Sequence, residues 1–288
     1  MEEEKVRLQH YVPRVYLKNF SEGSKKGYYI WVFDKKTEKI FQENIKNIAL
    51  EEEFYDTIEE KQITENFLRD IETNFGNAIN NLIDGQDLEK LGQDEIEAIT
   101  EFIAAQMIRT KEVRAEVKDA AKQFLGKFGS QLATNFKTEV EESMKKENLR
   151  EGHKKIIFEH LETFKQIIKG KKWILISNKS KFPYWISDNP IAECNRYGDA
   201  GLDALGVEIY FPISTKLCLI ICDPVAFRLE GNKKVTKDYR NIIRERDLQV
   251  RYSTRFVFSN EKNFDFARTM LKENPSLSDP NRKRVKIN

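Results

Sequence analysis

Cysteine, histidine and long apolar runs are scarce in this chain of 288 residues. The three cysteines, Cys194, Cys218 and Cys222, form no CxxC pair, and their number is odd. This pattern is typical of reduced, mostly buried thiols rather than of a disulfide framework. No apolar run reaches the roughly 18 residues that a membrane helix needs, and the N-terminus Met1–Glu4 does not resemble a signal peptide. We therefore expect a cytoplasmic protein with no membrane partner.

The common catalytic motifs are missing as well. The chain has no P-loop, no GxGxxG and no GxSxG sequence, so the site types that depend on them are set aside. His153 and His160 lie seven residues apart with no acidic residue in a zinc-binding pattern around them. A structural zinc site would need more cysteine and histidine ligands. Magnesium held by carboxylates is the one cofactor that the sequence still allows among those considered.

Charge, by contrast, is abundant and unevenly distributed. Residues 38–101 contain 18 acids and 5 bases, whereas residues 231–288 contain 15 bases and 7 acids. The basic end of the chain includes Arg282, Lys283 and Arg284, followed by Lys286. Two interpretations stay open. The basic C-terminal region contacts nucleic acid, or the two halves of the chain attract each other and the tail is a solvated end.

Hydrophobic periodicity predicts the order of the secondary-structure elements. The N-terminal third begins with a short helix from Pro13 to Phe20 and a hairpin of strands 28–33 and 39–42. Helical patterns then cover residues 60–83, 94–147 with breaks near Gly126 and Gly129, and 153–169. The expected strands of the last third are 173–177, 184–187, 207–211, 217–222 and 255–259, with helices over 236–247 and 263–273.

This order of elements predicts an α+β protein. We expect a mixed, mostly antiparallel sheet, built from the N-terminal hairpin and the C-terminal strands, with a large helical block inserted between them. The outer helices of that block are very polar, which predicts an arm on the surface. We expect one domain over residues 1–288, with residues 60–170 as a helical subdomain.

Several short motifs, spread over nearly the full length, resemble one known family. They are His10–Pro13, Tyr16–Phe20, Trp31–Asp34, Asn47–Ala49, Glu53–Tyr55, Gln106–Thr110, Trp185–Pro190, Phe211–Ser214 and Arg255–Ser259. On these motifs the chain is identified as a member of domain-of-unknown-function family 4238. The resemblance implies a bacterial, intracellular protein and supplies no established activity or cofactor. It indicates which residues to test, not what they do.

The first candidate site residues are His10, Tyr11 and Arg14, which lie close together around Pro13. An imidazole titrates near neutral pH and can transfer a proton, and a guanidinium can hold phosphate or carboxylate. If Pro13 begins a helix, His10 and Arg14 can converge at its N-terminus, which favours anions. Tyr11 is a candidate for substrate contact. The alternative is that His10 bonds to local backbone and Arg14 pairs with an acid.

Gln106 and Arg109 are the second pair of candidates. They are three residues apart on a predicted helix, where Gln106 falls inside the apolar stripe and Arg109 at its edge. An inward polar group that stays unpaired costs about 1–3 kcal/mol, so both side chains need a partner. That partner is either a bound ligand or an internal network that fastens the helix to the sheet.

The segment Ser187–Pro190 ends a predicted strand, and strand ends that open into loops often carry sites. Asp188 could orient His10, bind a metal or act as a base. Asp and Asn before Pro are also strong turn formers, and this interpretation is at least as good. Tyr55 is expected to be packed rather than reactive.

From these residues we expect an enzyme of phosphodiester or nucleotide chemistry, such as a nuclease-like effector of bacterial conflict or defence. His10 would be the general acid or base, Asp188 its orienter or a metal ligand, and Arg14 and Arg109 would hold phosphate. Gln106 would position the substrate, and the basic C-terminal region would attract the backbone of nucleic acid. The alternatives are a non-catalytic binding or protein-interaction module and a small-molecule sensor. The oligomeric state is not determined by the sequence.

Overall fold

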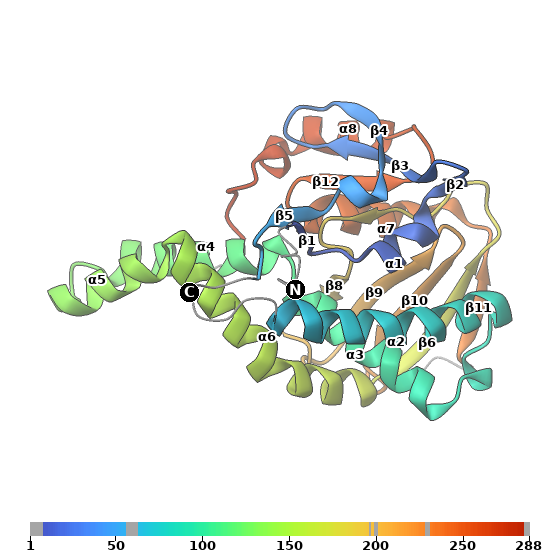
Figure 1. The fold of residues 1–288 in the computed structure, drawn as a ribbon, viewed down its shortest axis with the longest axis horizontal. Helices are drawn as coiled ribbons and strands as arrows, with labels where there is room; N and C mark the ends of the chain where they lie inside the picture. Colours follow the sequence, from blue (N-terminus) through green and yellow to red (C-terminus); the bar gives the residue numbers. More distant parts are fainter. Residues whose placement is uncertain (1–7, 56–62, 196, 199–200, 228–230, 285–288) are drawn as a thin grey trace, which may run out of the picture.

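The computed structural model describes residues 8–55, 63–195, 197–198, 201–227 and 231–284 (Figure 1). Its helices are α1 (Arg14–Leu17), α2 (Ile63–Gly85), α3 (Gln93–Ile108), α4 (Lys111–Phe128), α5 (Thr134–Ser143), α6 (Lys146–Lys169), α7 (Tyr239–Tyr252) and α8 (Asp265–Glu273). Its strands are β1 (Leu8–His10), β2 (Glu22–Ser24), β3 (Gly27–Asp34), β4 (Ile40–Asn44), β5 (Leu50–Glu52), β6 (Lys172–Asn178), β7 (Ile186–Ser187), β8 (Ala192–Asn195), β9 (Val207–Ser214), β10 (Leu217–Cys222), β11 (Lys233–Thr236) and β12 (Phe256–Ser259). The α+β class is confirmed.

The strands form three sheets. The one we call the C-terminal sheet has the order β11-β6-β10-β9-β8, with β11 parallel to β6 and its other described pairs antiparallel. The one we call the hairpin sheet has the order β2-β3-β12-β7, with β4 also paired to β3. A two-stranded ribbon joins β1 to β5.

The hairpin sheet unites the two ends of the chain, as the sequence predicts. β3 and β4 are the expected N-terminal hairpin, and β3 pairs with β12, so that Val32 lies opposite Phe258. The helix α8 covers this sheet, where Phe33 and Phe264 stack with ring centroids 5.6 Å apart. Because β12 also pairs with β7, Ser187 and the N-terminal hairpin lie in one sheet.

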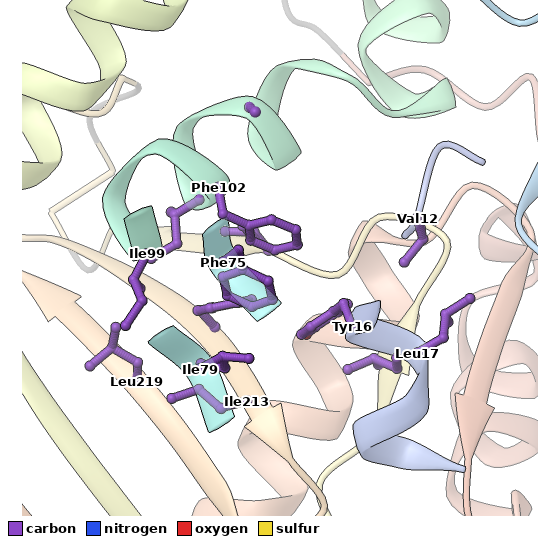
Figure 2. Close-up of a cluster of buried hydrophobic side chains, with 14 of the residues drawn as sticks. Val12, Tyr16, Leu17, Phe75, Ile79, Ile99, Phe102, Ile213 and Leu219 are labelled. Atoms are coloured by element: carbon purple, nitrogen blue, oxygen red, sulfur yellow. The ribbon is translucent and has the colours of Figure 1, made fainter. Parts of the chain in front are cut away.

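The helices α2 to α6 fill the predicted helical block between these strands. Figure 2 shows how α2 and α3 pack on one face of the C-terminal sheet. The buried side chains that meet there are Tyr16, Phe75, Ile79, Ile99, Phe102, Ile213 and Leu219. Burying each of them contributes roughly 1.5–3 kcal/mol, so this layer is the main core.

The predicted polar arm is also present. In Figure 1, α4 and α5 extend away from the two sheets, and α6 returns from them toward the C-terminal sheet. Within α5 no residue is buried, and within α4 only Glu112 is. No helix in the described part of the chain is long and apolar enough to cross a membrane.

The second face of the C-terminal sheet lies under α7. Alternation along β10 sends Leu219 to the helical block, while Cys218, Ile220 and Cys222 point the other way. The helix begins at Tyr239 rather than at residue 236, because the Asp238 side chain caps it by accepting the Arg240 N–H at 3.0 Å. The short strands β8 and β11 were not expected from the sequence.

Candidate functional site

The segment from His10 to Arg14 is held in place by the β1–β5 ribbon and by α1. The Tyr11 N–H donates to the Ala49 carbonyl at 3.0 Å, and Pro13 directly precedes α1. His10 is partly buried, whereas Arg14 is exposed. The two side chains therefore do not share one closed site.

The His10 imidazole is neutral at pH 7. Burial, together with the charges of Arg14 and Arg109, lowers its pKa to about 4, against hydrogen bonding to the Ile45 backbone. Its Nε2 atom is buried and has no hydrogen-bond partner among the described residues.

Arg109 is completely enclosed, with its side chain 1% exposed. Its Nε donates to the Tyr55 hydroxyl at 2.9 Å, Nη1 to the Glu72 carboxylate at 2.9 Å, and Nη2 to the His10 carbonyl at 2.8 Å. Burial by itself opposes the charged form, but Tyr55 and Glu72 more than offset it and raise the pKa of Arg109. Each of its three guanidinium nitrogens already has a protein partner, and Tyr55 is packed, as expected.

Gln106 uses its amide in the same way. Its side chain is fully buried, and Nε2 donates to the Tyr11 carbonyl at 2.9 Å. The Tyr11 ring is buried against Phe54, with centroids 5.3 Å apart. The inward orientation that the sequence predicts for Gln106 and Arg109 is confirmed, and both side chains bind protein groups, although Gln106 Oε1 has no partner among the described residues.

Asp188 is 1% exposed, and its carboxylate accepts hydrogen bonds from the backbone at the start of β12. Oδ1 accepts the Thr254 N–H at 2.8 Å, and Oδ2 accepts the N–H groups of Arg255 and Phe256 at 2.8 and 2.9 Å. Burial raises its pKa against these bonds. Both of its oxygens face backbone donors, an arrangement that fixes a chain turn.

The three segments that the sequence singles out do meet in space. Arg109 and Gln106 bind the backbone of His10 and Tyr11, and the Thr110 hydroxyl donates to Asn189 Oδ1 at 2.9 Å. We call the buried polar groups of Tyr11, Tyr55, Gln106, Arg109 and Asp188 the junction. Since its hydrogen bonds run mostly to main-chain groups, the junction ties β1, α3 and β12 together.

Two arginines of the basic tail form ion pairs with an acid of the protein itself. Arg282 and Arg284 donate to the buried Glu112 carboxylate at 2.9 and 2.8 Å. Lys283 is exposed, and Lys286 lies outside the described residues. These contacts join the basic tail to α4, at an acid that lies outside the acidic stretch 38–101.

The two histidines of α6 behave differently from each other. His153 is buried, receives the Arg114 Nε–H on Nδ1 at 2.9 Å and contacts the Ile108 carbonyl through Nε2 at 2.7 Å. Burial lowers its pKa to about 3. His160 is exposed. Among the residues that the structure describes, no group of three His, Cys, Asp or Glu side chains could hold a metal ion.

A pocket of about 280 Å³ lies elsewhere, between α7 and the second face of the C-terminal sheet. It is lined by Ile174, Ile176, Tyr184, Glu208, Tyr210, Cys218, Ile220, Cys222, Lys234, Val235, Thr236, Asn241, Arg244 and Glu245. The lining comes from β6, β9, β10, β11, α7 and the segment before β7. None of the six residues predicted from the sequence is in it. An apolar cavity with a few converging polar groups is the usual form of a small-molecule site.

Two acids give the pocket its polar character. Arg244 Nη2 donates to Glu208 Oε2 at 2.8 Å, and the Tyr210 hydroxyl approaches Glu208 Oε1 at 3.3 Å. Glu245 is 1% exposed; its Oε2 accepts the Trp185 N–H at 3.3 Å, and its Oε1 has no partner among the described residues. Burial raises the pKa of Glu245 to about 8, against the Trp185 N–H, the Arg246 charge and the Gln249 side chain, so this carboxyl is mainly protonated at pH 7.

The sequence contains one signal for this pocket. Glu245 stands between Ile242 and Leu248 on the buried stripe of α7, the same kind of inward polar position that marks Gln106 on α3. The rest of the lining comes from segments far apart in the chain and has no local pattern.

A family model described as "Protein of unknown function (DUF4238)" matches residues 8–263. The chain belongs to this family. The match covers most of the chain, including both the junction and the pocket, and confirms the resemblance seen in the sequence motifs. No curated protein and no solved structure was found to match this DUF4238 chain.

Proposed function

We propose that this DUF4238 protein is a non-catalytic binding protein that holds a small organic molecule in the pocket between the C-terminal sheet and α7. The observation that carries the proposal is the Glu245 carboxyl group, buried in the pocket wall with Oε1 unpaired among the described residues. An unpaired buried polar atom costs about 1–3 kcal/mol, which a polar group of a ligand can offset.

The junction supports the same proposal by contrast. Holding a phosphate would require Arg109 to leave Tyr55, Glu72 and the His10 carbonyl. Releasing Asp188 would free three backbone N–H groups. The pocket needs no such rearrangement, because its volume and its unpaired carboxyl oxygen already exist.

A screen of small fragments by ligand-observed NMR tests the proposal. We expect several molecules of about 10 non-hydrogen atoms to bind, since a cavity of roughly 150 Å³ already accepts benzene. Ile220→Trp places a large ring in the cavity and should abolish this binding. Val225→Trp, at an exposed position, is the matched control and should leave it unchanged.

Because overpacking can unfold a protein, each variant is first checked by circular dichroism, with Ile220→Phe as the milder replacement. No bound fragment, or fragments that bind equally to the wild type and to a folded Ile220 variant, would contradict the proposal.

A second candidate function places the site at the N-terminal segment from His10 to Arg14. Here the favouring observation is the His10 Nε2 atom, neutral and without a partner among the described residues, with the exposed Arg14 close enough to influence its pKa. A neutral imidazole can accept a proton, and a free guanidinium can hold a phosphate. We therefore also propose, as the alternative, cleavage of a phosphodiester at this position.

This alternative is tested with purified protein against mixed RNA and DNA, with and without magnesium. Loss of cleavage in His10→Ala and weaker binding in Arg14→Ala would support it. Equal cleavage by the wild type and His10→Ala would remove His10 from the mechanism. No cleavage of any substrate would count against the class of enzyme.

A further inference from the structure

The lining of the pocket contains two basic and two acidic side chains. Arg244 and Lys234 are its two cations, and Lys234 is exposed at the edge strand β11. Of its two acids, Glu208 pairs with Arg244 at 2.8 Å, whereas burial raises the pKa of Glu245 to about 8. Lys234 has no ion-pair partner among the described residues.

The Arg244 guanidinium has hydrogen-bond donors that it does not use within the described part of the protein. The side chain is 37% exposed, and Nη2 makes both of its hydrogen bonds, to Glu208 Oε2 and to Cys194 Sγ at 3.7 Å, while the guanidinium lies 5.5 Å from the centroid of the Tyr210 ring. No partner among the described residues binds Nε or Nη1. A guanidinium with two free N–H directions suits the two oxygens of a planar anion.

The inner part of the pocket is apolar and enclosed. Ile174 and Cys218 are 1% exposed, and Tyr184 is 3% exposed. Glu245 lies on this enclosed side, close enough to the Cys218 thiol and the Tyr184 phenol to influence their pKa values. A ligand that fills the pocket would therefore place an apolar body inside and its charged group near the more exposed Arg244.

We propose that the pocket selects a small organic monocarboxylate whose apolar body packs on Ile174, Ile176 and Ile220 and whose carboxylate binds Arg244. This inference rests on the proposed binding function and names its ligand class. One carboxylate suits this lining, because Arg244 keeps Nε and Nη1 unused among the described residues. The protonated Glu245 is the remaining donor for an oxygen of the ligand.

Four probes with the same phenyl body test the ligand class by isothermal titration at pH 7: phenylacetate, phenylacetamide, phenethylamine and phenyl phosphate. We expect phenylacetate to bind about tenfold more tightly than phenylacetamide, the gain typical of a charge-assisted hydrogen bond, and phenethylamine to bind most weakly. In Arg244→Gln the affinity for phenylacetate should fall to that for phenylacetamide.

The outcomes separate the two proposals. Equal binding of the acid and the amide, or tightest binding of the amine or the phosphate, would overturn the carboxylate class and leave the binding function standing. No binding of any probe or of any fragment would count against both.

The protonation of Glu245 supplies a second readout. Above about pH 8 this carboxyl ionises and adds a negative charge beside the ligand, so the affinity for phenylacetate should fall by up to about tenfold per pH unit. The titratable groups within electrostatic range of Glu245 are Cys218, Tyr16, Tyr184 and Arg246; burial raises the pKa of the thiol and the two phenols and lowers the pKa of Arg246 to about 10. Glu245→Gln should bind phenylacetate with no such fall, and a fall of equal size in this variant would contradict the role of Glu245.

Discussion

The junction and the pocket both contain buried polar side chains, but they use them differently. In the junction, Arg109 and Asp188 bind chain segments that are far away in sequence, and their donors and acceptors are satisfied by the protein. In the pocket, Glu245 keeps an oxygen without a partner in the described part of the chain, and Arg244 keeps unused donors. Buried polar residues therefore need partners, and unpaired hydrogen-bonding groups that line a cavity indicate where that partner is a ligand.

The largest effect is expected from breaking the junction at Arg109. Arg109→Met would leave the Glu72 carboxylate, the Tyr55 hydroxyl and the His10 carbonyl without their donor. Removing one partner of a buried ion pair costs about 3–5 kcal/mol, so the free energy of unfolding in urea should fall by that amount. Arg14→Met, at an exposed position, is the control and should change it by less than about 0.5 kcal/mol. Equal effects of the two variants would show that the junction does not stabilise the fold.

The next largest effect is a gain of stability, and it concerns Glu245 in the pocket. The pKa of Glu245 rises from 4.5 to about 8 on folding, so between these pH values the unfolded chain is ionised while the folded protein holds the proton. Wild-type stability therefore decreases as the pH rises through this range, whereas that of Glu245→Gln does not. At pH 7 the variant should be more stable by roughly 3 kcal/mol, and the difference should vanish near about pH 4.

Urea unfolding at several pH values measures this difference. The control is Glu273→Gln on the surface of α8, which should change stability little at any pH. A pH-independent effect of Glu245→Gln would mean that Glu245 is ionised in the folded protein.

The smallest expected effect on stability comes from Gln106, and it tests whether this side chain fastens α3 to β1. Gln106→Leu removes the donor to the Tyr11 carbonyl but also removes the unpaired Oε1 atom, so the net loss of stability should be about 1 kcal/mol. Gln106→Glu places an acceptor against that carbonyl and should cost more at pH 7. If Leu and Glu cost the same in urea unfolding, the amide–carbonyl bond does not fasten α3 to β1.

Much of the fold could be predicted from periodicity, because long apolar stripes and alternating strands report which side of an element faces the core. The helical block follows from such patterns, and the order of the elements predicted that the N-terminal hairpin joins C-terminal strands. That its partner is β12, while β6, β9 and β10 form another sheet, was decided by tertiary structure. The strand β11 could not be predicted, since Lys233–Thr236 is polar and becomes a strand only by pairing with β6. For the site, the inward direction of Gln106 and Arg109 was predictable, while their partners were not.

The sequence by itself determined the α+β class, the family, and the positions where polar side chains turn inward, because these depend on local spacing along one helix or strand. Tertiary structure alone decided that the groups of the junction bind the backbone and that a cavity remains beneath α7. Hydrogen-bond satisfaction and empty volume arise between segments such as β6, β9, β10 and α7, and no single segment contains them.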